Sequence, residues 1–390
     1  ANIQSNDPSQ VVAGNERVIR PRLADAAFFY KNDRLISLEQ RRQSLKRVVF
    51  QDKLGSVFDK TERVANLCSQ LAPYTGANAK LARRAGELCK SDLVTDMVGE
   101  FADLQGVMGR YYALNDGEDT NVAEAQLEQY LPRFSGDRTP DNAVGATLAL
   151  ADKLDTLVGI FSIGQPPSGS RDPFALRRAS LGILRILLER KIDVDLTKAI
   201  SLAAAQFGLD PSSLDKTHKQ VLTYVLERFR SWYRDEGFSA EVFLSVSTLD
   251  FANPLDIDAR IKAVAQFCLL PEADALSSAN KRVSNILAKQ LGTRLPEPVN
   301  HALLQESAEK TLAQAIETLE DSSKPLLASR DYTALLKSLS SLREPVDRFF
   351  DEVMVMSEEP ALRENRLSLL KRLRGLFLNV ADISQLVTGK

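Results

Sequence analysis

The feature that most constrains the fold is the stretch of residues 164–191, GQPPSGSRDPFALRRASLGILRILLERK, in which a loop becomes a strongly apolar helix. The prolines and glycines of its first half exclude helical structure there. Asp172 followed by Pro173 predicts the start of the helix, because Asp is a favoured N-cap and Pro is tolerated at the first helical position. Apolar side chains then lie on nearly all sides of the helix. This pattern is typical of a buried helix, so we predict that it lies in a core.

Apolar residues recur at helical spacing along almost all of the 390 residues, whereas alternation with period two is rare. We therefore predict an all-α fold with a single extended segment at residues 10–19. A chain of this length exceeds the usual size of one hydrophobic core. We expect an N-terminal remnant or linker at residues 1–20, a helical domain at 21–191, a helical connector at 192–253 and a second helical bundle at 254–390.

The composition limits the classes of partner. The formal net charge is −2, so the chain lacks the overall positive field of a protein that coats nucleic acid, and any RNA binding must come from local groups. No segment reaches the roughly 18 apolar residues of a membrane helix, so no membrane partner is expected. Three cysteines without a CxxC pair indicate reduced thiols and a cytoplasmic location.

Three groups of basic and polar side chains are candidates for RNA binding. Between residues 362 and 380, apolar side chains form a stripe that should pack inward, and basic side chains lie on another face. Guanidinium groups on such a face can bind phosphates, although a merely solvated face is the alternative. The candidates are Arg363, Asn365, Lys371 and Arg374 in this helix, Lys281, Arg282 and Asn285 in a second helix, and Arg171, Arg177 and Arg178 near the helix start at Asp172.

A series of acidic residues suggests a second kind of site, a hydrolytic one. The series comprises Asp92, Asp96, Glu100 and Asp103 at helical spacing, with Asp152 and Asp155 on another helix. Converging carboxylates can hold a divalent metal or transfer protons. The competing interpretation makes Asp92 a helix N-cap and lets Asp152 and Asp155 orient Arg177 or Arg178. The sequence contains no P-loop, GxSxG elbow or zinc-ligand cluster, so we predict no catalytic residue and no metal site.

Four stretches in the chain resemble one known family. They are DLVTDMVGEFADLQGVMGRYYA from residue 92, LALADKLDTLVGIFSIG from residue 148 with the PPSGSRDPFALRRASLG after it, ANKRVSNILAK from residue 279, and FFDEVMVM with LRENRLSLLKRLRGLF between residues 349 and 377. In this order they resemble the β subunit of the bacterial heterotetrameric glycyl-tRNA synthetase. The resemblance runs from about residue 14 to near the C-terminus and covers only the later part of that subunit, so we expect a fragment.

The resemblance implies that residues 21–191 form a domain related to the HD metal-dependent phosphohydrolases. That chemistry needs histidines, because imidazoles bind the metal ion that activates water. The chain has only His218 and His301, both outside this domain, and it carries Gln129 where some relatives have a histidine. We therefore expect a degenerate HD-like domain without hydrolytic activity.

The resemblance also implies that residues 254–390 form an anticodon-binding bundle similar to that of arginyl-tRNA synthetase. Asp258 and Arg260 in its first helix are expected to be structural. The family's tRNA contacts, carried over onto matching positions, fall at Lys281, Arg282, Asn285, Arg363, Asn365 and Arg366.

The function that the resemblance implies is tRNA recognition. The chain would bind tRNA(Gly), including its anticodon arm, and support ATP-dependent glycylation by an α2β2 glycine–tRNA ligase formed with an α subunit. ATP and Mg are expected for the whole enzyme, whereas this fragment is expected to bind no cofactor, no DNA and no membrane. Two alternatives stay open: an HD-type metal-dependent phosphohydrolase, and a purely structural scaffold for the α subunit.

Overall fold

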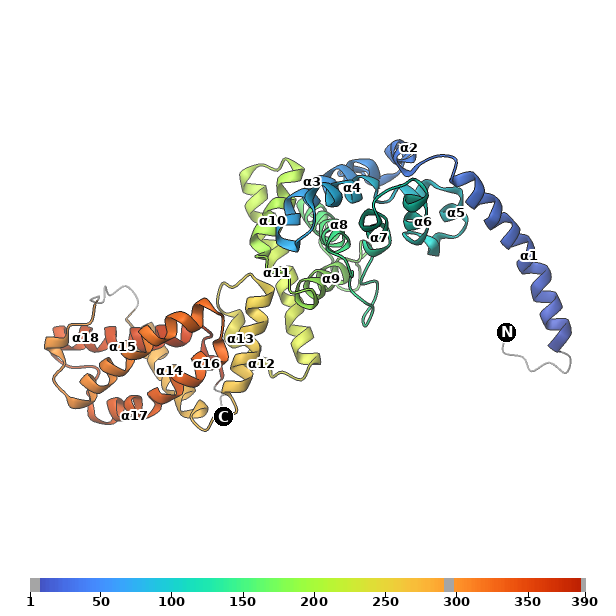
Figure 1. Cartoon of the computed structure of the whole chain (residues 1–390). Coiled ribbons are helices and arrows are strands. Elements are labelled where there is room, and N and C mark those ends of the chain that lie inside the picture. Colours follow the sequence, from blue (N-terminus) through green and yellow to red (C-terminus); the bar gives the residue numbers. More distant parts are fainter. Residues whose placement is uncertain (1–7, 291–297, 387–390) are drawn as a thin grey trace. The chain divides into compact units, whose positions relative to one another are not determined.

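The computed structural model describes residues 8–290 and 298–386, and nearly all of their regular structure is helical (Figure 1). The prediction of an all-α fold is confirmed. Contacts divide the chain into two compact units, Ala1–Val225 and Leu226–Lys390, which we call unit 1 and unit 2. The division falls inside the predicted connector, and the predicted domain boundaries stay a prediction. None of the helices within the described ranges is long and apolar enough to cross a membrane.

Unit 1 consists of helices and one small antiparallel sheet, in which Val49 pairs with Ser56 and Gln51 with Gly55. Short 3-10 helices are labelled η. The elements are α1 (Pro8–Asp33), α2 (Leu38–Arg42), η1 (Gln43–Arg47), β1 (Val49–Gln51), β2 (Gly55–Ser56), α3 (Val57–Thr75), α4 (Ala79–Leu88), η2 (Ser91–Val94), α5 (Asp96–Glu100), η3 (Ala102–Leu104), α6 (Val107–Asn115), α7 (Thr120–Glu128), α8 (Ala143–Ser162), α9 (Leu176–Glu189), α10 (Leu196–Ala204), η4 (Ala205–Phe207) and α11 (Pro211–Asp235), which continues into unit 2.

Helix α8 is the centre of unit 1. It packs against α3, α4, α7, α9 and α10, and Figure 1 shows it among these helices. Most of its side chains are buried, including the charged Lys153 and Asp155. The Asn142 side chain begins the helix by accepting the N–H of Gly145 at 2.8 Å. The predicted core helix is α9, which buries Ile183, among other apolar residues, on one side.

Unit 2 is a second helical bundle. In it α13 packs against α12 and α16, α15 against α16, α17 and α18, and α14 against α17 and α18. After the end of α11 its elements are α12 (Ala240–Ser247), α13 (Pro254–Phe267), α14 (Ala273–Ala288), η5 (His301–Leu303), α15 (Ser307–Ala328), α16 (Tyr332–Leu339), η6 (Ser340–Leu342), α17 (Arg343–Glu352), α18 (Pro360–Leu378) and η7 (Ile383–Leu386).

The extended segment predicted at residues 10–19 is wrong, because α1 covers it. Residues 1–7 of the predicted linker lie outside the described residues, and residues 8–20 form the first part of this helix. The valine pair at 11–12 and the pair Val18 and Ile19 lie seven residues apart, which is two helical turns, and this spacing fits a helix as well as a strand.

The predicted start of the core helix is also displaced. Helix α9 begins at Leu176, after Ala175 in the left-handed region (φ 52°), and not at Pro173. Asp172 still caps the helix, because its carboxylate accepts two backbone N–H groups of the first turn, those of Leu176 (2.8 Å) and Arg177 (3.0 Å). The cap was therefore correctly identified, but it reaches the helix across a turn of chain.

We expect Gly86→Ala to destabilise unit 1 through the contact of α4 with α3. A Cβ at position 86 would lie 2.5 Å from the Cα of Ala65, so the two backbones would have to separate. Such overpacking costs about 1–3 kcal/mol. Thermal unfolding, followed together with amide hydrogen exchange in α3, should show an earlier transition. The control is Gly14→Ala in α1, where an added Cβ meets nothing within 4 Å. Equal melting temperatures of the two variants would show that α3 and α4 accommodate the extra methyl group without loss of stability.

Candidate nucleic-acid interface

The predicted RNA-binding residues of unit 2 lie on two helices that pack against each other, α14 and α18. On α14, Arg282 and Asn285 are exposed and Lys281 is half-buried. The Arg282 guanidinium lies 4.1 Å from the ring centroid of Phe350, a half-buried residue of α17. This arrangement offers a cation and an aromatic ring together at the surface of the bundle.

Two of the predicted contacts on α18 are buried. Asn365 is fully buried and bonds the backbone of Asn300, accepting its N–H at 2.7 Å and donating to its C=O at 3.0 Å. Arg366 forms an ion pair with the fully buried Glu309 and donates to the carbonyl of Met354 at 2.8 Å. The chain itself occupies their polar groups, so we leave both residues out of the proposed RNA surface.

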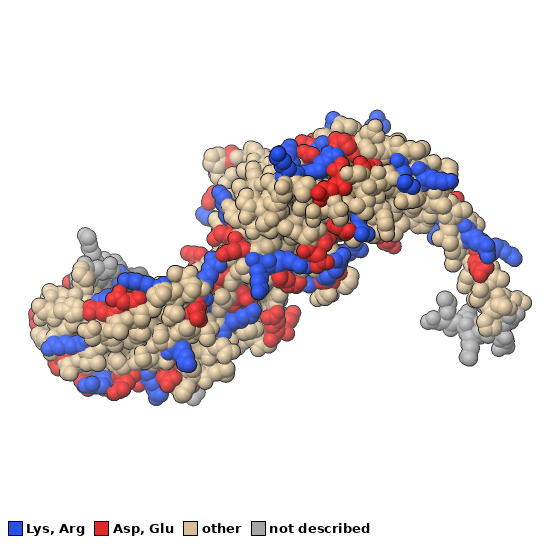
Figure 2. Space-filling view, viewed as in Figure 1, with Lys and Arg blue, Asp and Glu red and all other residues tan. Residues whose placement is uncertain are grey.

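The other candidates on α18 differ in how far they face solvent. Lys371 is exposed. Arg363 is half-buried and donates to the carbonyl of Ser357 at 3.3 Å. Arg374 forms an ion pair with Asp382 at 2.8 Å, which ties the end of α18 to the segment after it. Charged residues of both signs are interspersed on the face drawn in Figure 2, as the net charge of −2 leads us to expect.

Asp258 and Arg260 have the structural roles that the sequence predicts. The Asp258 carboxylate accepts the hydroxyl of the buried Tyr233 at 2.7 Å. Burial, together with this carboxylate, raises the pKa of Tyr233. Arg260 is buried, pairs with Asp256 at 2.6 Å and donates to the Tyr332 hydroxyl at 2.8 Å. These bonds join α13 to α11 and α16 within unit 2.

Phe349 and Phe377 belong to the core, because their side chains are 0% and 1% exposed. Their rings are therefore unavailable for stacking on bases. Among the phenylalanines of α17 and α18, Phe350 alone reaches the surface in part.

The acidic series of unit 1 does not lie along one helix. Its members fall in η2, α5 and η3, three short elements separated by turns. Asp92 is buried and accepts the N–H groups of Gly106 (2.6 Å) and Gly109 (3.3 Å), so it caps α6 and not its own helix. Burial raises the pKa of Asp92, while these N–H groups oppose the rise. Thr95 is the N-cap of α5.

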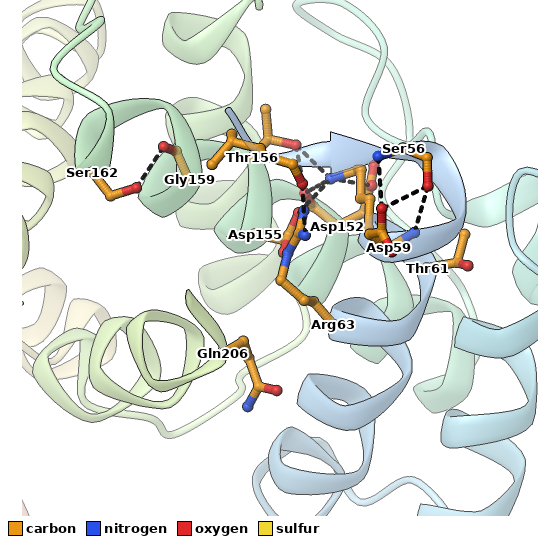
Figure 3. Close-up of polar contacts among 12 residues, drawn as sticks. Ser56, Asp59, Thr61, Arg63, Asp152, Asp155, Thr156, Gly159, Ser162 and Gln206 are labelled. Atoms are coloured by element: carbon orange, nitrogen blue, oxygen red, sulfur yellow. Dashed lines mark hydrogen bonds and ion pairs between the residues drawn. The ribbon is translucent and has the colours of Figure 1, made fainter. Parts of the chain in front are cut away.

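Asp152 and Asp155 orient cationic side chains, but not the predicted Arg177 or Arg178. Asp155 pairs with Lys60 (3.0 Å) and with Arg63 (2.7 Å), both from α3. Figure 3 shows Asp152, Asp155 and Thr156 of α8 gathered beside Arg63. The prediction failed because Lys60 and Arg63 lie about 90 residues earlier, and no local pattern links them to α8.

Three lysines surround Asp152. Lys60 and Lys90 lie 3.0 and 3.2 Å from its carboxylate oxygens, and Lys153 is its neighbour in α8. Burial alone would raise the pKa of Asp152, but the three ammonium groups outweigh it and hold the pKa below its usual range. Burial lowers the pKa of Lys153 to about 8. Sequence reasoning missed these lysines, although one signal existed: Lys153 lies with Asp152 and Asp155 in a helix that is otherwise largely apolar, and buried charges require partners.

Arg171, Arg177 and Arg178 lie in the segment before α9 and in its first turn. Arg171 and Arg178 are exposed. Arg177 is half-buried, and its guanidinium donates to the carbonyl of Gly169. The three arginines are close in sequence. Of the three, Arg178 alone lines the pocket that Lys153 also lines.

No group of three His, Cys, Asp or Glu side chains that could hold a metal ion occurs within residues 8–290 and 298–386. His218 contacts the carbonyl of Thr197 at 3.0 Å, and His301 contacts Glu317 at 2.8 Å. The two histidines thus have separate local partners, and nothing in the described chain assembles the ligands of an HD-type centre.

We expect Asp155→Asn to destabilise unit 1 by about 3–5 kcal/mol, because the half-buried Arg63 loses its carboxylate partner and the buried Lys60 keeps only Asp152 of its two. Urea unfolding should shift to a lower midpoint. Asp52→Asn, at an exposed site of the same unit, is the control and should change stability by less than about 0.5 kcal/mol. Matching midpoints for the two variants would show that the pairing of Asp155 contributes little.

Comparison with known proteins identifies the family. A family model described as glycyl-tRNA synthetase beta subunit matches residues 1–248. A second, described as DALR anticodon binding domain, matches residues 276–383 and so spans most of α14 and all of α15 to α18.

Several curated proteins are similar to the chain over its whole length. The glycine–tRNA ligase beta subunit of Marinobacter nauticus is 56% identical over 389 residues, which is 100% of this chain and 56% of the relative. Those of Pseudomonas fluorescens and Hahella chejuensis are 52% and 50% identical over 386 residues, which is 99% of this chain and 56% of each relative. The chain thus spans just over half the length of these relatives. Because the first family model alone covers more than half of the chain, the chain belongs to the glycyl-tRNA synthetase beta subunit family.

Proposed function

We propose that the chain recognises tRNA(Gly), including its anticodon arm, for ATP-dependent glycylation by a ligase that it forms with an α subunit. One observation carries the proposal: the match to an anticodon binding domain falls on the helices of unit 2 that display the predicted cations. The names of the relatives, glycine–tRNA ligase beta subunit, support the choice of amino acid and of partner.

Arg282, Asn285 and Lys371 form the proposed RNA surface, and Arg363 lies about two turns before Lys371 on the same helix. The ammonium and guanidinium groups would neutralise backbone phosphates, which position an RNA without reading its sequence. Arg282 and Phe350 present flat faces on which an unpaired base can stack, and the Asn285 amide can bond a base edge.

In the whole enzyme, we propose, the α subunit activates glycine with ATP and Mg, while this chain places the tRNA. An α2β2 assembly in the cytoplasm belongs to the same proposal. No residue of this chain is assigned a step in the chemistry. The phosphohydrolase alternative lacks support from the described residues, since they assemble no metal-ligand group.

The test compares binding of a tRNA(Gly) transcript to the full chain and to the double variant Arg282→Glu, Lys371→Glu. We expect weaker binding and a salt dependence whose slope, log K against log salt, falls by about 2, because each lost phosphate contact removes about one unit. The charge-matched control is Lys310→Glu, Lys337→Glu, two exposed lysines on α15 and α16 of the same unit.

A transcript with a replaced anticodon separates base recognition from phosphate binding. The proposal predicts that the unmodified chain binds this transcript more weakly than the native one. In the double variant, the difference in affinity between the two transcripts should be smaller. If the double variant and its control bind the native transcript equally, the RNA surface assigned to α14 and α18 is wrong. A scaffold for the α subunit would then be the better interpretation.

A further inference from the structure

Unit 1 contains a pocket of about 440 Å³ that the proposed function does not use. It lies between the first turn of α9, the middle of α8 and the segment that follows α7. A pocket of this volume falls within the range of small-molecule sites. Six of its lining residues determine its chemistry: Lys90, Gln129, Tyr130, Arg133, Lys153 and Arg178.

Positive charge prevails in this pocket. Four cationic side chains line it, against the two carboxylates Asp103 and Asp152. Asp152 is already paired with Lys60 and Lys90. The Lys153 ammonium donates to two neutral acceptors, the carbonyls of Gln129 (3.2 Å) and Leu131 (2.7 Å). Its charge is therefore solvated by the backbone and not neutralised by a contacting carboxylate within the described chain.

Two of the cationic side chains that line the pocket are exposed to solvent. Arg133 and Arg178 are both exposed, and neither guanidinium forms a hydrogen bond or ion pair with any residue in the described ranges. Guanidinium groups bind phosphate oxygens in a bidentate manner, and a site that combines them with a buried ammonium favours an anion.

Three buried polar atoms of pocket-lining residues have no hydrogen-bond partner within the described chain: Oε1 of Gln129, the hydroxyl of Tyr130 and Oδ1 of Asp152. The Asp152 oxygen is compensated by the Lys60 ammonium at 3.0 Å. The Gln129 side chain is 1% exposed, and its Nε2 donates to the carbonyl of Gln126, which leaves the oxygen as an acceptor. Buried polar groups in folded proteins are nearly always satisfied by protein, water or ligand, so the Gln129 oxygen and the Tyr130 hydroxyl are available to a bound molecule. Burial raises the pKa of Tyr130, so its hydroxyl stays protonated and can donate to an anion.

The ligand must therefore carry both negative charge and a hydrogen-bond donor. Inorganic phosphate in its dianionic form would satisfy the cations and carries one P–O–H donor, but it would leave much of a pocket of about 440 Å³ open. A nucleotide meets both needs, because its phosphate faces the cations while a ribose hydroxyl or a base amino group donates to the amide oxygen. Phe174, half-buried in the pocket wall, adds an apolar ring that can contact a sugar or base.

We propose that this pocket binds the phosphate group of a nucleotide. The inference does not rest on the anticodon-binding role of unit 2, because every lining residue belongs to unit 1. A nucleotide can enter as a free monophosphate or as part of an RNA chain, and the shared chemistry is the phosphate with its adjoining sugar and base.

The first test is titration calorimetry of the full chain with the four ribonucleoside 5′-monophosphates, with adenosine and with inorganic phosphate. We expect saturable binding of at least one monophosphate, more tightly than phosphate and much more tightly than adenosine. A 5′-phosphorylated RNA tetranucleotide distinguishes the two sources of ligand. Tighter binding of the oligonucleotide than of the monophosphates indicates RNA, and equal or weaker binding indicates a free nucleotide. Absence of saturable binding by every monophosphate at millimolar concentration would overturn the proposal.

Two variants connect binding to this pocket. Arg133→Ala with Arg178→Ala should weaken monophosphate binding by about ten-fold or more, since hydrogen bonds to charged groups are lost. Arg47→Ala with Lys80→Ala, two exposed cations of unit 1 outside the pocket, is the charge-matched control.

Tyr130→Phe removes only the hydroxyl and should weaken binding roughly five-fold. Its urea midpoint should not fall, because the hydroxyl has no partner to lose within the described chain. A purely structural role for Tyr130 predicts instead unchanged monophosphate affinity and a lower urea midpoint. If Tyr130→Phe and the double arginine variant both bind the monophosphate as tightly as the control variant does, the nucleotide binds outside this pocket.

Discussion

The pairing of Asp155 with Lys60 and Arg63 is the interaction on which unit 1 depends. Helix α8 is buried on nearly all sides, so an ionised carboxylate in its middle is tolerated only where opposite charges reach it. Both partners lie on α3, one turn apart, and this fixes how α3 runs beside α8. The close contact of Gly86 with Ala65 then sets the position of α4 against α3. Ionic pairing thus specifies an arrangement that apolar packing alone would leave less defined.

The same charged cluster leaves a positively charged wall on one side of α8. Asp152 has two lysine partners at about 3 Å, whereas Lys153, next to it in sequence, donates to two backbone carbonyls and pairs with no carboxylate of residues 8–290 and 298–386. Gly182 of α9 makes room for that lysine, since a Cβ there would lie 2.9 Å from its Cε. A domain that lacks the histidines of an HD-type centre therefore still has a polar pocket, but one whose chemistry suits an anion and not a metal ion.

Unit 2 shows how one residue type serves two purposes. Arg260 and Arg366 are buried. Arg260 pairs with Asp256 of its own helix and donates to the carbonyls of Asn379 and Val380, which follow α18. Arg366 joins α18 to α15 through Glu309 and donates to the carbonyl of Met354. Arg282 lies at the surface over an aromatic ring. Sequence spacing placed Arg363, Lys371 and Arg374 on a face away from the apolar stripe, and the resemblance added Arg366. Neither revealed that Arg366 is buried, because the stripe does not show which polar neighbour a second helix will cover.

The sequence by itself determined the helical class, the cap at Asp172 and, through four motifs, the family, whose resemblance implied the structural roles of Asp258 and Arg260. These follow from local spacing, caps and motifs that can be read over one or a few turns. It failed at residues 10–19, where the apolar spacing fits a strand and a helix equally, and at Asp92, whose partners Gly106 and Gly109 follow after two intervening elements. Only the tertiary structure decided that Asn365 is buried and that Lys60, Lys90 and Lys153 meet around Asp152. Those contacts join residues up to 92 positions apart, and burial and charge pairing at such separations depend on how helices pack, which no local pattern encodes.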